Sequence, residues 1–305
     1  MKNTNLNKAK RVKDDEFYTK LSTIENEIPH YASHFNGKTV YCNCDDPRIS
    51  EFFTFFTMHF HALGLKKLIT TCYKNEISKR AIHLEYSGDK VKNWYPNAEY
   101  IGFKDLKGDG DFRSSECIEL LKESDIVVTN PPFSLFREYV AQLIQYEKKF
   151  LILGNFNAIT YKEIFALLND NTIWLGHSRI GKDYFLPDGT KKYVATYWYT
   201  NMSHKRRNKN LTLTKTYNEK DYPKYDTYDA INVDKVKDIP KDYDGVIGVP
   251  ISFLDKHNPD QFELLGIDRY IEDNPHYGRR FRINGKEQYA RILIRRKIQP
   301  MGAHI

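Results

Sequence analysis

The sequence predicts an α/β protein in which helices cover both faces of a mostly parallel sheet, followed by a smaller basic C-terminal region. Through residues 38–156, short apolar runs rich in β-branched residues alternate with helix-like segments. No clear two-residue hairpin turn separates these runs, which favours parallel strands joined by helices. After about residue 172 the pattern changes to short strand-like runs with glycine and proline turns.

The first part of the chain contains alternating strand and helix candidates. Strands are expected at residues 38–44, 66–73, 98–103, 125–130 and 149–156, and helices at 46–64, 114–124 and 134–148. The first helix candidate opens with Asp46 as a possible N-cap and Pro47 at the first helical position. Ligands of such sheets bind at the carboxyl ends of the strands, and residues 129–133 occupy one of those ends.

The later part predicts strands at residues 173–176, 184–189 and 190–201, the last of which could still belong to the main sheet. Only short ordered pieces are expected over residues 218–245, and strand-like character resumes at 245–255 and 262–267. We therefore predict a basic arm over 1–13, an α/β domain over 14–202 and a C-terminal region over 203–305, with a second boundary that could lie from about 171 to 203.

Charge is distributed in blocks along the chain. Lys and Arg outnumber Asp and Glu by 5 to 0 in residues 1–13 and by 24 to 17 in 171–305, whereas the middle has 18 against 23. Basic flanks around an acidic middle favour a polyanionic partner, although each cluster alone is more often a solvated surface. The candidate DNA contacts are Lys10, Arg11, Lys13, Arg179, Lys205, Arg206, Arg207 and Asn208, and residues 279–282 form a further basic cluster.

Cysteine content and hydropathy exclude several classes of protein. The chain has four cysteines and no CxxC pair, which argues against a disulfide scaffold or a zinc site. Cys42 and Cys44 are expected to be two small residues on one face of a buried strand, and we expect no bound metal. No run of about 18 apolar residues occurs, so we expect a cytoplasmic protein with no membrane partner.

The segment Asn130-Pro131-Pro132-Phe133 follows the apolar run at 125–129. Proline has no backbone donor, so the strand ladder stops and the Asn130 side chain and the Pro131 carbonyl become neighbouring acceptors. Two convergent acceptors suit both hydrogens of an exocyclic amine, whose lone pair is otherwise delocalised into its ring. Phe133 could stack on a flat base, a contact worth about 1–3 kcal/mol.

A strand that simply ends before a helix is the structural alternative for this motif. The aromatic residue and helix that follow it favour a binding role, as does the upstream segment Gly108–Phe112. Asp111 could accept a hydrogen bond from a purine amine and Phe112 could cover its ring. These residues point to a planar nitrogen substrate without specifying which one.

The chain resembles the N6-adenine DNA methyltransferases, and among them the EcoRI-type family, whose catalytic motif is (D/N)PP(F/Y/W). The motif alone is shared with RNA and protein methyltransferases, but the combined set of segments is specific. These segments are DEFYT at 15–19, VYCNCDDPR at 40–48, GDGDFRSSE at 108–116, SDIVVTNPPFSLF at 124–136, ITYKE at 159–163, YPKYD at 222–226, YDAINV at 228–233 and GVPISFL at 248–254.

The resemblance implies a class I S-adenosylmethionine-dependent methyltransferase fold, with a catalytic domain over 14–202 and target recognition over 203–305. It assigns the catalytic motif to Asn130, Pro131, Pro132 and Phe133. Cofactor-binding positions are Phe17, Tyr18 and Thr19, which match the amino-terminal motif, and Asp111 and Phe112, for which the cofactor role is now preferred to the substrate role.

The loop after the first strand departs from the usual pattern because it contains no glycine. The EcoRI-type family shares this feature, so Asn43, Asp45 and Asp46 are the candidates for cofactor contact there. Asp46 as a helix N-cap is an equal alternative. Glu76 is a weak candidate for the acid that would bind the cofactor ribose.

The function implied is methyl transfer from S-adenosylmethionine to N6 of an adenine flipped out of double-stranded DNA, within a short site for which GAATTC is a hypothesis. The enzyme is expected to act as a monomer, with a cognate restriction endonuclease as a functional and not a physical partner. The alternatives are an RNA or protein methyltransferase with the same motif, or a DNA-binding relative without catalysis.

Overall fold

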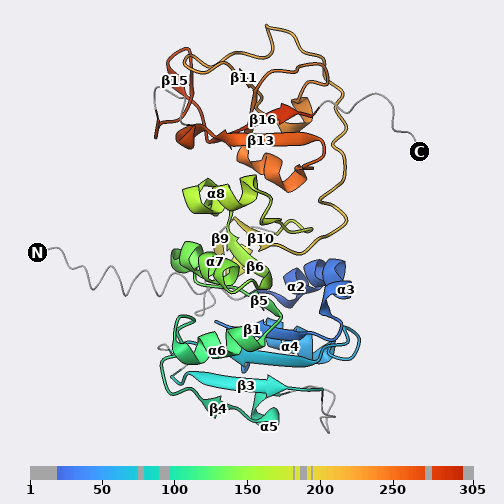
Figure 1. Cartoon of the computed structure of the whole chain (residues 1–305), viewed down its shortest axis with the longest axis vertical. Helices are drawn as coiled ribbons and strands as arrows, with labels where there is room; N and C mark the ends of the chain where they lie inside the picture. The colour runs from blue at the N-terminus through green and yellow to red at the C-terminus, as the bar shows by residue number, and fades with distance from the viewer. Residues whose placement is uncertain are drawn as a thin grey trace, which may run out of the picture. The chain divides into compact units, whose positions relative to one another are not determined.

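The computed structural model describes residues 19–74, 79–88, 97–180, 183–185, 191–193, 195–271 and 277–297 (Figure 1). The chain forms two compact units. The first comprises Met1–Ala158 and Gly176–His204, and the second comprises Ile159–Leu175 and Lys205–Ile305. The chain thus passes from the first unit into the second and back before it leaves the first unit at His204. The catalytic and target-recognition roles given to the two parts stay predictions.

The first unit contains a twisted sheet with strand order β4-β3-β2-β1-β5-β6-β10. The four central strands β2, β1, β5 and β6 are mutually parallel, whereas β3 and β10 run antiparallel to their neighbours. The mostly parallel sheet predicted from the sequence is confirmed. The strands are β1 Thr39–Cys42, β2 Lys67–Thr71, β3 Ile82–Tyr86, β4 Lys104–Asp105, β5 Ile126–Thr129, β6 Lys149–Asn155 and β10 Thr196–Thr200. The pair β8 Asp183–Phe185 and β9 Lys191–Tyr193 forms a separate hairpin.

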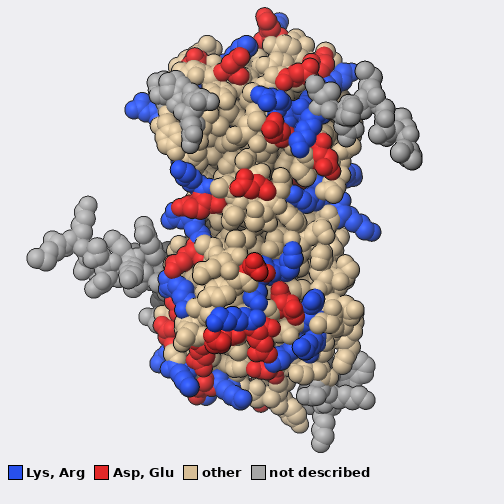
Figure 2. All heavy atoms as spheres, in the orientation of Figure 1, with Lys and Arg blue, Asp and Glu red and all other residues tan. Residues whose placement is uncertain are grey.

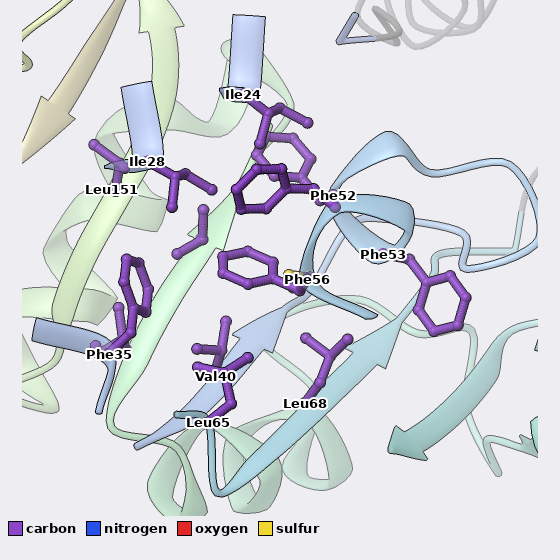
Figure 3. Packing of buried hydrophobic residues seen from close by; sticks show 14 of the residues in the cluster. Ile24, Ile28, Phe35, Val40, Phe52, Phe53, Phe56, Leu65, Leu68 and Leu151 are labelled. Carbon is purple, nitrogen blue, oxygen red and sulfur yellow. The ribbon is translucent and has the colours of Figure 1, made fainter. Parts of the chain in front are cut away.

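Helices cover both faces of this sheet, as the sequence predicted. Figure 3 shows Ile24 and Ile28 from the N-terminal helices, and Phe52 and Phe56 from α4, packed toward Val40 and Leu68 of the strands. On the opposite face, Tyr41 contacts Cys117 of α6. The helices of this unit are α2 Leu21–Glu27, η1 Ile28–Tyr31, α3 Ala32–Phe35, α4 Glu51–Met58, α5 Ala98–Ile101, α6 Ser115–Glu123, η2 Phe133–Leu135 and α7 Phe136–Gln145, and η3 Phe156–Thr160 follows β6.

Two elements of the first unit differ from the predictions. Residues 98–101 form α5 and not a strand, because Asn97 caps the helix by accepting a hydrogen bond from the Glu99 amide at 2.8 Å. The neighbouring strand is instead β3, whose alternating burial over residues 82–86 was missed in the sequence. The helices predicted at 114–124 and 134–148 are confirmed, with ends shifted by a few residues.

The helix predicted from Asp46 begins later, at Glu51. Its N-cap is Ser50, whose hydroxyl oxygen accepts from the amides of Phe52 and Phe53 at 3.1 and 3.3 Å. Asp46 instead closes a turn by accepting from the Arg48 amide at 3.0 Å. The prediction that Asp46 caps this helix was wrong, because Ser50 satisfies the helix amides.

The second unit is built on a four-stranded sheet of order β11-β12-β16-β13. Its strands β12, β16 and β13 are antiparallel, and α8 packs against β13. As predicted, residues 218–245 contain only short ordered pieces, whereas β16 was not predicted. The elements are α8 Lys162–Asn169, β7 Trp174–Leu175, β11 Ile231–Asn232, η4 Val236–Asp238, β12 Ile247–Pro250, η5 Ile251–Lys256, β13 Phe262–Ile267, η6 Asp268–Tyr270, β14 Arg282–Ile283, β15 Lys286–Glu287 and β16 Arg291–Arg296.

Membrane-spanning helices and metal-binding clusters, neither of which the sequence predicts, can be looked for in the described residues. None of the helices in this part of the chain is long and apolar enough to cross a membrane. Within the same residues, no group of three or more His, Cys, Asp or Glu side chains is placed to hold a metal ion.

Candidate active site at the carboxyl ends of the central strands

The Asn-Pro-Pro-Phe motif lies where β5 ends. Thr129, the last residue of β5, is fully buried, and the chain then leaves the sheet through Asn130 and two prolines. Pro132 is extended and its carbonyl accepts from the Leu135 amide at 3.0 Å, which begins η2 at Phe133. Because prolines donate no backbone hydrogen bond, the strand stops here and the chain turns into α7. The predicted place of the motif, between a buried strand and a helix, is confirmed.

A buried network joins this motif to the loop after β1. The Thr129 hydroxyl lies within hydrogen-bonding distance of the Asn43 carbonyl oxygen and of Asp45 Oδ2, the latter at 2.5 Å, so these two acceptors share its one proton. Asp45 also accepts from the backbone amide of Asn130. The Tyr139 hydroxyl on α7 donates to Asn43 Oδ1. The loop after β1 is therefore held against the stretch from the end of β5 to α7, across 86 to 96 positions of sequence.

Asp45 is the carboxylate at the centre of this network. It also accepts from the Ser50 hydroxyl at 3.3 Å, while its own amide donates to the Thr71 carbonyl at 3.1 Å. Burial raises the pKa of Asp45 to about 7, against the opposing effect of its hydrogen bonds. The nearby carboxylate of Asp46 raises this pKa further. Asp45 can therefore change its charge near neutral pH.

The loop after β1 makes its bend without glycine. Cys44 has φ 62°, in the left-handed region that residues with a Cβ rarely adopt. Cys42 lies in β1 and is fully buried, but Cys44 lies beyond the strand. The prediction that both cysteines share one face of a strand was therefore wrong for Cys44, which forms the bend itself.

Asp46 is already paired within this loop. Its carboxylate accepts from Arg48 Nε at 2.8 Å and from Arg48 Nη2 at 2.6 Å. This bidentate pair raises the pKa of the Arg48 guanidinium. Asp46 and Arg48 therefore form an ion pair within one turn, next to the hydrogen-bonded network around Asp45.

The segment around Gly110 lies against the loop after β2. Gly110 has φ 80°, and a Cβ at this position would lie 2.2 Å from the Cys72 carbonyl oxygen, so glycine is required. The Lys74 amide donates to the Asp109 carbonyl at 2.7 Å, which joins the same two segments. This approach brings the residues that follow, Asp111 and Phe112, to the edge where the network lies.

Asp111 and Phe112 occupy different environments. The Asp111 carboxylate accepts from Arg113 Nη2 at 2.6 Å, and this guanidinium lowers the pKa of Asp111. The Phe112 ring is buried and meets the Tyr139 ring edge-on, with the centroids 5.0 Å apart. Tyr139 therefore links two of the predicted positions, because its ring contacts Phe112 and its hydroxyl donates to Asn43.

Comparison with known proteins identifies the family to which this chain belongs. The sequence profile described as "Adenine-specific methyltransferase EcoRI" matches residues 5–297. The type II methyltransferase M.EcoRI of Escherichia coli is 50% identical to the chain, and the alignment covers 96% of each protein. The chain belongs to the EcoRI adenine-specific methyltransferase family. It is a type II DNA adenine methyltransferase, as the resemblance implied.

More distant relatives agree with this EcoRI-family membership. The type II methyltransferase M.MgeORF184P of Mycoplasma genitalium is 38% identical over 95% of this chain and 98% of its own. M.MpnI of Mycoplasma pneumoniae is 37% identical with the same coverage. No solved structure gives a significant match to the chain.

Several positions predicted for this EcoRI-family site lie elsewhere or outside the described residues. Thr19 is buried at the start of the described chain. The amino-terminal positions Phe17 and Tyr18, the arm residues Lys10, Arg11 and Lys13, and Glu76 are outside the described residues. Their roles stay predictions.

The predicted DNA contacts of the second unit make internal contacts. Arg206 Nη2 donates to Asp255 Oδ2 at 2.7 Å, and the Asp255 side chain is buried. The Arg207 guanidinium lies 3.9 Å from the centroid of the Trp174 ring and donates to Asn171 at 2.9 Å. Lys205 and Asn208 are exposed, as is Arg179 of the first unit. Their role in DNA binding, like that of Arg206 and Arg207, stays a prediction.

Sequence reasoning missed Thr129 and Tyr139. Tyr139 lies in a helix with buried neighbours at Phe136, Val140 and Leu143, a spacing that indicates only a core-facing side. Its hydroxyl partner Asn43 is 96 positions away. No local pattern could have shown that this tyrosine contributes a hydrogen bond to the site.

Proposed function

We propose that the protein transfers a methyl group from S-adenosylmethionine to N6 of adenine in double-stranded DNA. The observation that supports this most is the position of Asn130-Pro131-Pro132-Phe133 at the carboxyl end of a central parallel strand, hydrogen-bonded through Asp45 to the loop after β1. In sheets of this type, the ends of these two adjacent strands are where ligands bind. Family membership supports adenine as the base.

In this proposal, the Asn130 side chain and the Pro131 carbonyl accept the two hydrogens of the adenine N6 amine. Accepting both hydrogens favours a tetrahedral nitrogen whose lone pair points away from the ring and toward the methyl donor. Phe133 is half-buried at the start of η2 and stacks on the base. Pro131 and Pro132 hold these groups in place because their φ angles are restricted.

The residues at this edge suit a cationic cofactor. Bound S-adenosylmethionine would supply an electrophilic methyl group on a positively charged sulfur. Asp45, Asp46 and Asp111 follow the strand ends, and the latter two are each paired with an arginine. Asp45 accepts hydrogen bonds from neutral groups, namely Thr129, Ser50 and the Asn130 amide. Of the three carboxylates it is therefore the one best suited to a cationic ligand. Asn43, Phe112 and the amino-terminal Phe17, Tyr18 and Thr19 complete the proposed cofactor site.

Adenine in a duplex must leave the base stack to reach this site, at a cost of a few kcal/mol. Basic side chains would offset that cost through phosphate contacts. The 50% identity to M.EcoRI supports GAATTC as the first candidate recognition sequence. We propose that the enzyme acts as a monomer in the cytoplasm and protects DNA from a cognate restriction endonuclease that it does not bind.

A methyl-transfer assay tests this proposal. The full-length protein is incubated with labelled S-adenosylmethionine and a duplex containing GAATTC, a duplex with that site scrambled, RNA, or a protein mixture. We expect label in adenine N6 of the first duplex. Label found only in RNA or protein would contradict the proposed function, and no binding of S-adenosylhomocysteine by the folded protein would indicate a relative without catalysis.

The same assay tests the role of Asn130. Asn130→Ala removes one acceptor of the amine, so we expect methyl transfer to fall by at least about a hundredfold, the scale of losing one positioned hydrogen-bonding group. Affinity for S-adenosylhomocysteine and for duplex DNA should stay within about twofold. A near-normal rate in this variant would contradict the acceptor role while leaving the proposed reaction intact.

A further inference from the structure

A short basic hairpin in the second unit is held more firmly than its size explains. It consists of β14 and β15, which pair antiparallel as Arg282 with Glu287 and Ile283 with Lys286. In Figure 1 it is marked by the label β15. A two-stranded hairpin alone is at best marginally stable in water. Contacts from the rest of the unit must therefore hold it in place.

The turn of this hairpin has a defined geometry. Asn284 and Gly285 have φ angles of 49° and 75°. Positive φ at both central residues is the type I′ turn, which matches the twist of the strands it joins. Asn-Gly is the residue pair that this turn favours. The tip of the hairpin is therefore set by local conformation.

A single carboxylate clamps this turn from outside the hairpin. Asp226 Oδ1 accepts from the Asn284 amide and Asp226 Oδ2 accepts from the Gly285 amide, each at 2.8 Å. The Asp226 amide in turn donates to the Arg282 carbonyl at 2.9 Å. Three hydrogen bonds from one residue thus fix both the turn and the strand that leads into it.

The base of the hairpin is anchored by an aromatic cluster. Phe281, directly before β14, is buried. Its ring stacks on Tyr228, with centroids 5.2 Å apart, and lies 4.7 Å from the Tyr225 ring. The Gln288 amide donates to the Phe281 carbonyl at 2.9 Å and extends the ladder to the anchor. The exposed end is therefore held rigid relative to the core of the second unit.

The part of the hairpin that faces solvent is basic. Arg279, Arg282 and Lys286 are exposed, and Glu287 is the only acidic residue from 279 to 287. None of the ion pairs between described residues involves these three cations. Two tyrosines flank them, Tyr277 at 51% and Tyr289 at 82% exposure. Exposed cations outside the described ion pairs, with exposed tyrosines on either side in the sequence, suit phosphates and base edges.

We propose that the hairpin Arg282–Glu287 is a DNA-contacting element of the second unit and that Asp226 is its positioning residue. The major groove of B-DNA admits a two-stranded β-ribbon. Arg282 shares one face of the ribbon with Glu287, whereas Lys286 shares the opposite face with Ile283, which packs against the aromatic cluster. Arg282 is therefore the cation on the face turned away from the core, with the exposed Asn284 at the turn. This inference rests on the proposed function, because it takes duplex DNA as the substrate.

The test measures binding and turnover of the full-length protein with a fluorescent GAATTC duplex and a scrambled duplex. Arg282→Ala should weaken binding about tenfold, the effect of losing one good base or phosphate contact. Glu287→Gln should tighten binding about threefold by removing the hairpin's acid. Lys256→Ala, which removes an exposed lysine of η5 outside the hairpin, is the matched control and should change affinity less than twofold.

Asp226→Ala separates positioning from a general loss of structure. We expect KM for DNA to rise about fivefold with kcat at saturating DNA unchanged, and S-adenosylhomocysteine affinity unchanged. A fall in kcat together with a lower thermal midpoint would mean that Asp226 only maintains the fold, and would overturn its positioning role.

The outcomes for the hairpin and for the proposed function can be distinguished. If the unaltered protein methylates GAATTC and the Arg282 and Glu287 variants bind DNA as the Lys256 variant does, the hairpin inference is overturned alone. If the unaltered protein neither binds nor methylates the duplex, the proposed function fails and the hairpin inference fails with it.

Discussion

At the scale of single residues, Asp45 is a carboxyl whose pKa is moved to near neutrality by its environment. It connects the loop after β1 to the Asn-Pro-Pro-Phe motif through Thr129 and the Asn130 amide, and burial raises its pKa to about 7. Asp45 is half-buried, and its carboxylate is an acceptor for Thr129, Ser50 and the Asn130 amide. Its charge, however, destabilises the fold when no cation is near.

The stability of the protein should therefore depend on pH through Asp45. Its folded pKa is raised above the value of about 4 in the unfolded chain, so ionisation opposes folding progressively from about pH 4 to pH 7. At about 1.4 kcal/mol per pKa unit, the full penalty at pH 8 is on the order of 4 kcal/mol. Asp45→Asn removes this penalty while keeping an acceptor for Thr129.

We expect urea unfolding to show Asp45→Asn more stable than the unaltered protein at pH 8, by about 1–3 kcal/mol once the loss of one acceptor is included. The difference should fall as the pH is lowered and reverse in sign near pH 4, where the ionisation penalty is gone and only the loss of the acceptor, about 1–3 kcal/mol, remains. Parallel pH profiles for the two proteins would contradict the buried titration of Asp45. S-adenosylhomocysteine affinity at each pH reports separately on its proposed cofactor contact.

At the scale of elements, the candidate site lies beside two loops, one after β2 and one before α6, that approach each other closely. Gly110 makes this approach possible, because its φ is 80° and because a Cβ there would lie 2.2 Å from the Cys72 carbonyl oxygen; both exclude other residues. Gly102 offers a matched control: its φ is 85°, but nothing lies within 4 Å of the same position.

Gly110→Ala should destabilise the protein by about 2–4 kcal/mol, because backbone strain adds to displacement of the loop after β2. Gly102→Ala should cost only the strain, about 1–2 kcal/mol. Chemical denaturation measures both, and cofactor affinity should weaken only for Gly110→Ala, since Asp111 and Phe112 follow it. Equal losses of stability in the two variants would mean that the close approach contributes nothing.

The elements also show which features a sequence reveals. Residues 125–133 combine a buried β-branched run with two prolines, so both β5 and the turn into α7 could be predicted locally. β3 was not predicted, because buried and more exposed residues alternate over only five positions, 82–86. Residues 98–103 were predicted as a strand because their apolar residues suit one, whereas the Asn97 cap favours the helix α5.

Contacts between distant positions carry no such local signal. Tyr139 meets Asn43 across 96 positions, and Asp226 reaches the turn of β14 and β15 across 58 and 59. Arg206 and Arg207 were predicted as DNA contacts from their charge, but the sequence could not show that Asp255 and Trp174 already meet them. Among the residues of these contacts, only the Asn284-Gly285 pair has a local sequence pattern, which predicts the turn of a β-hairpin.

At the scale of the whole molecule, the net charge of +7 is concentrated at the two ends of the sequence. On the face shown in Figure 2, Lys and Arg side chains are interspersed with Asp and Glu. That face offers no uniform basic surface to a polyanion. Binding to DNA should therefore depend on particular clusters, of which residues 1–13, with five cations and no acid, form the most strongly charged.

Replacing Lys2, Lys8, Lys10, Arg11 and Lys13 together by Gln tests the contribution of that arm while keeping its length. Each phosphate contact contributes about −0.9 to the slope of log affinity against log salt concentration. If the arm contacts about three to five phosphates, by the charges available, the slope should become shallower by about 3–4 units. We expect the loss to be equal for GAATTC and scrambled duplexes, because phosphate contacts carry no sequence information. Affinity for S-adenosylhomocysteine should not change, and an unchanged salt slope would show that the arm does not contact DNA.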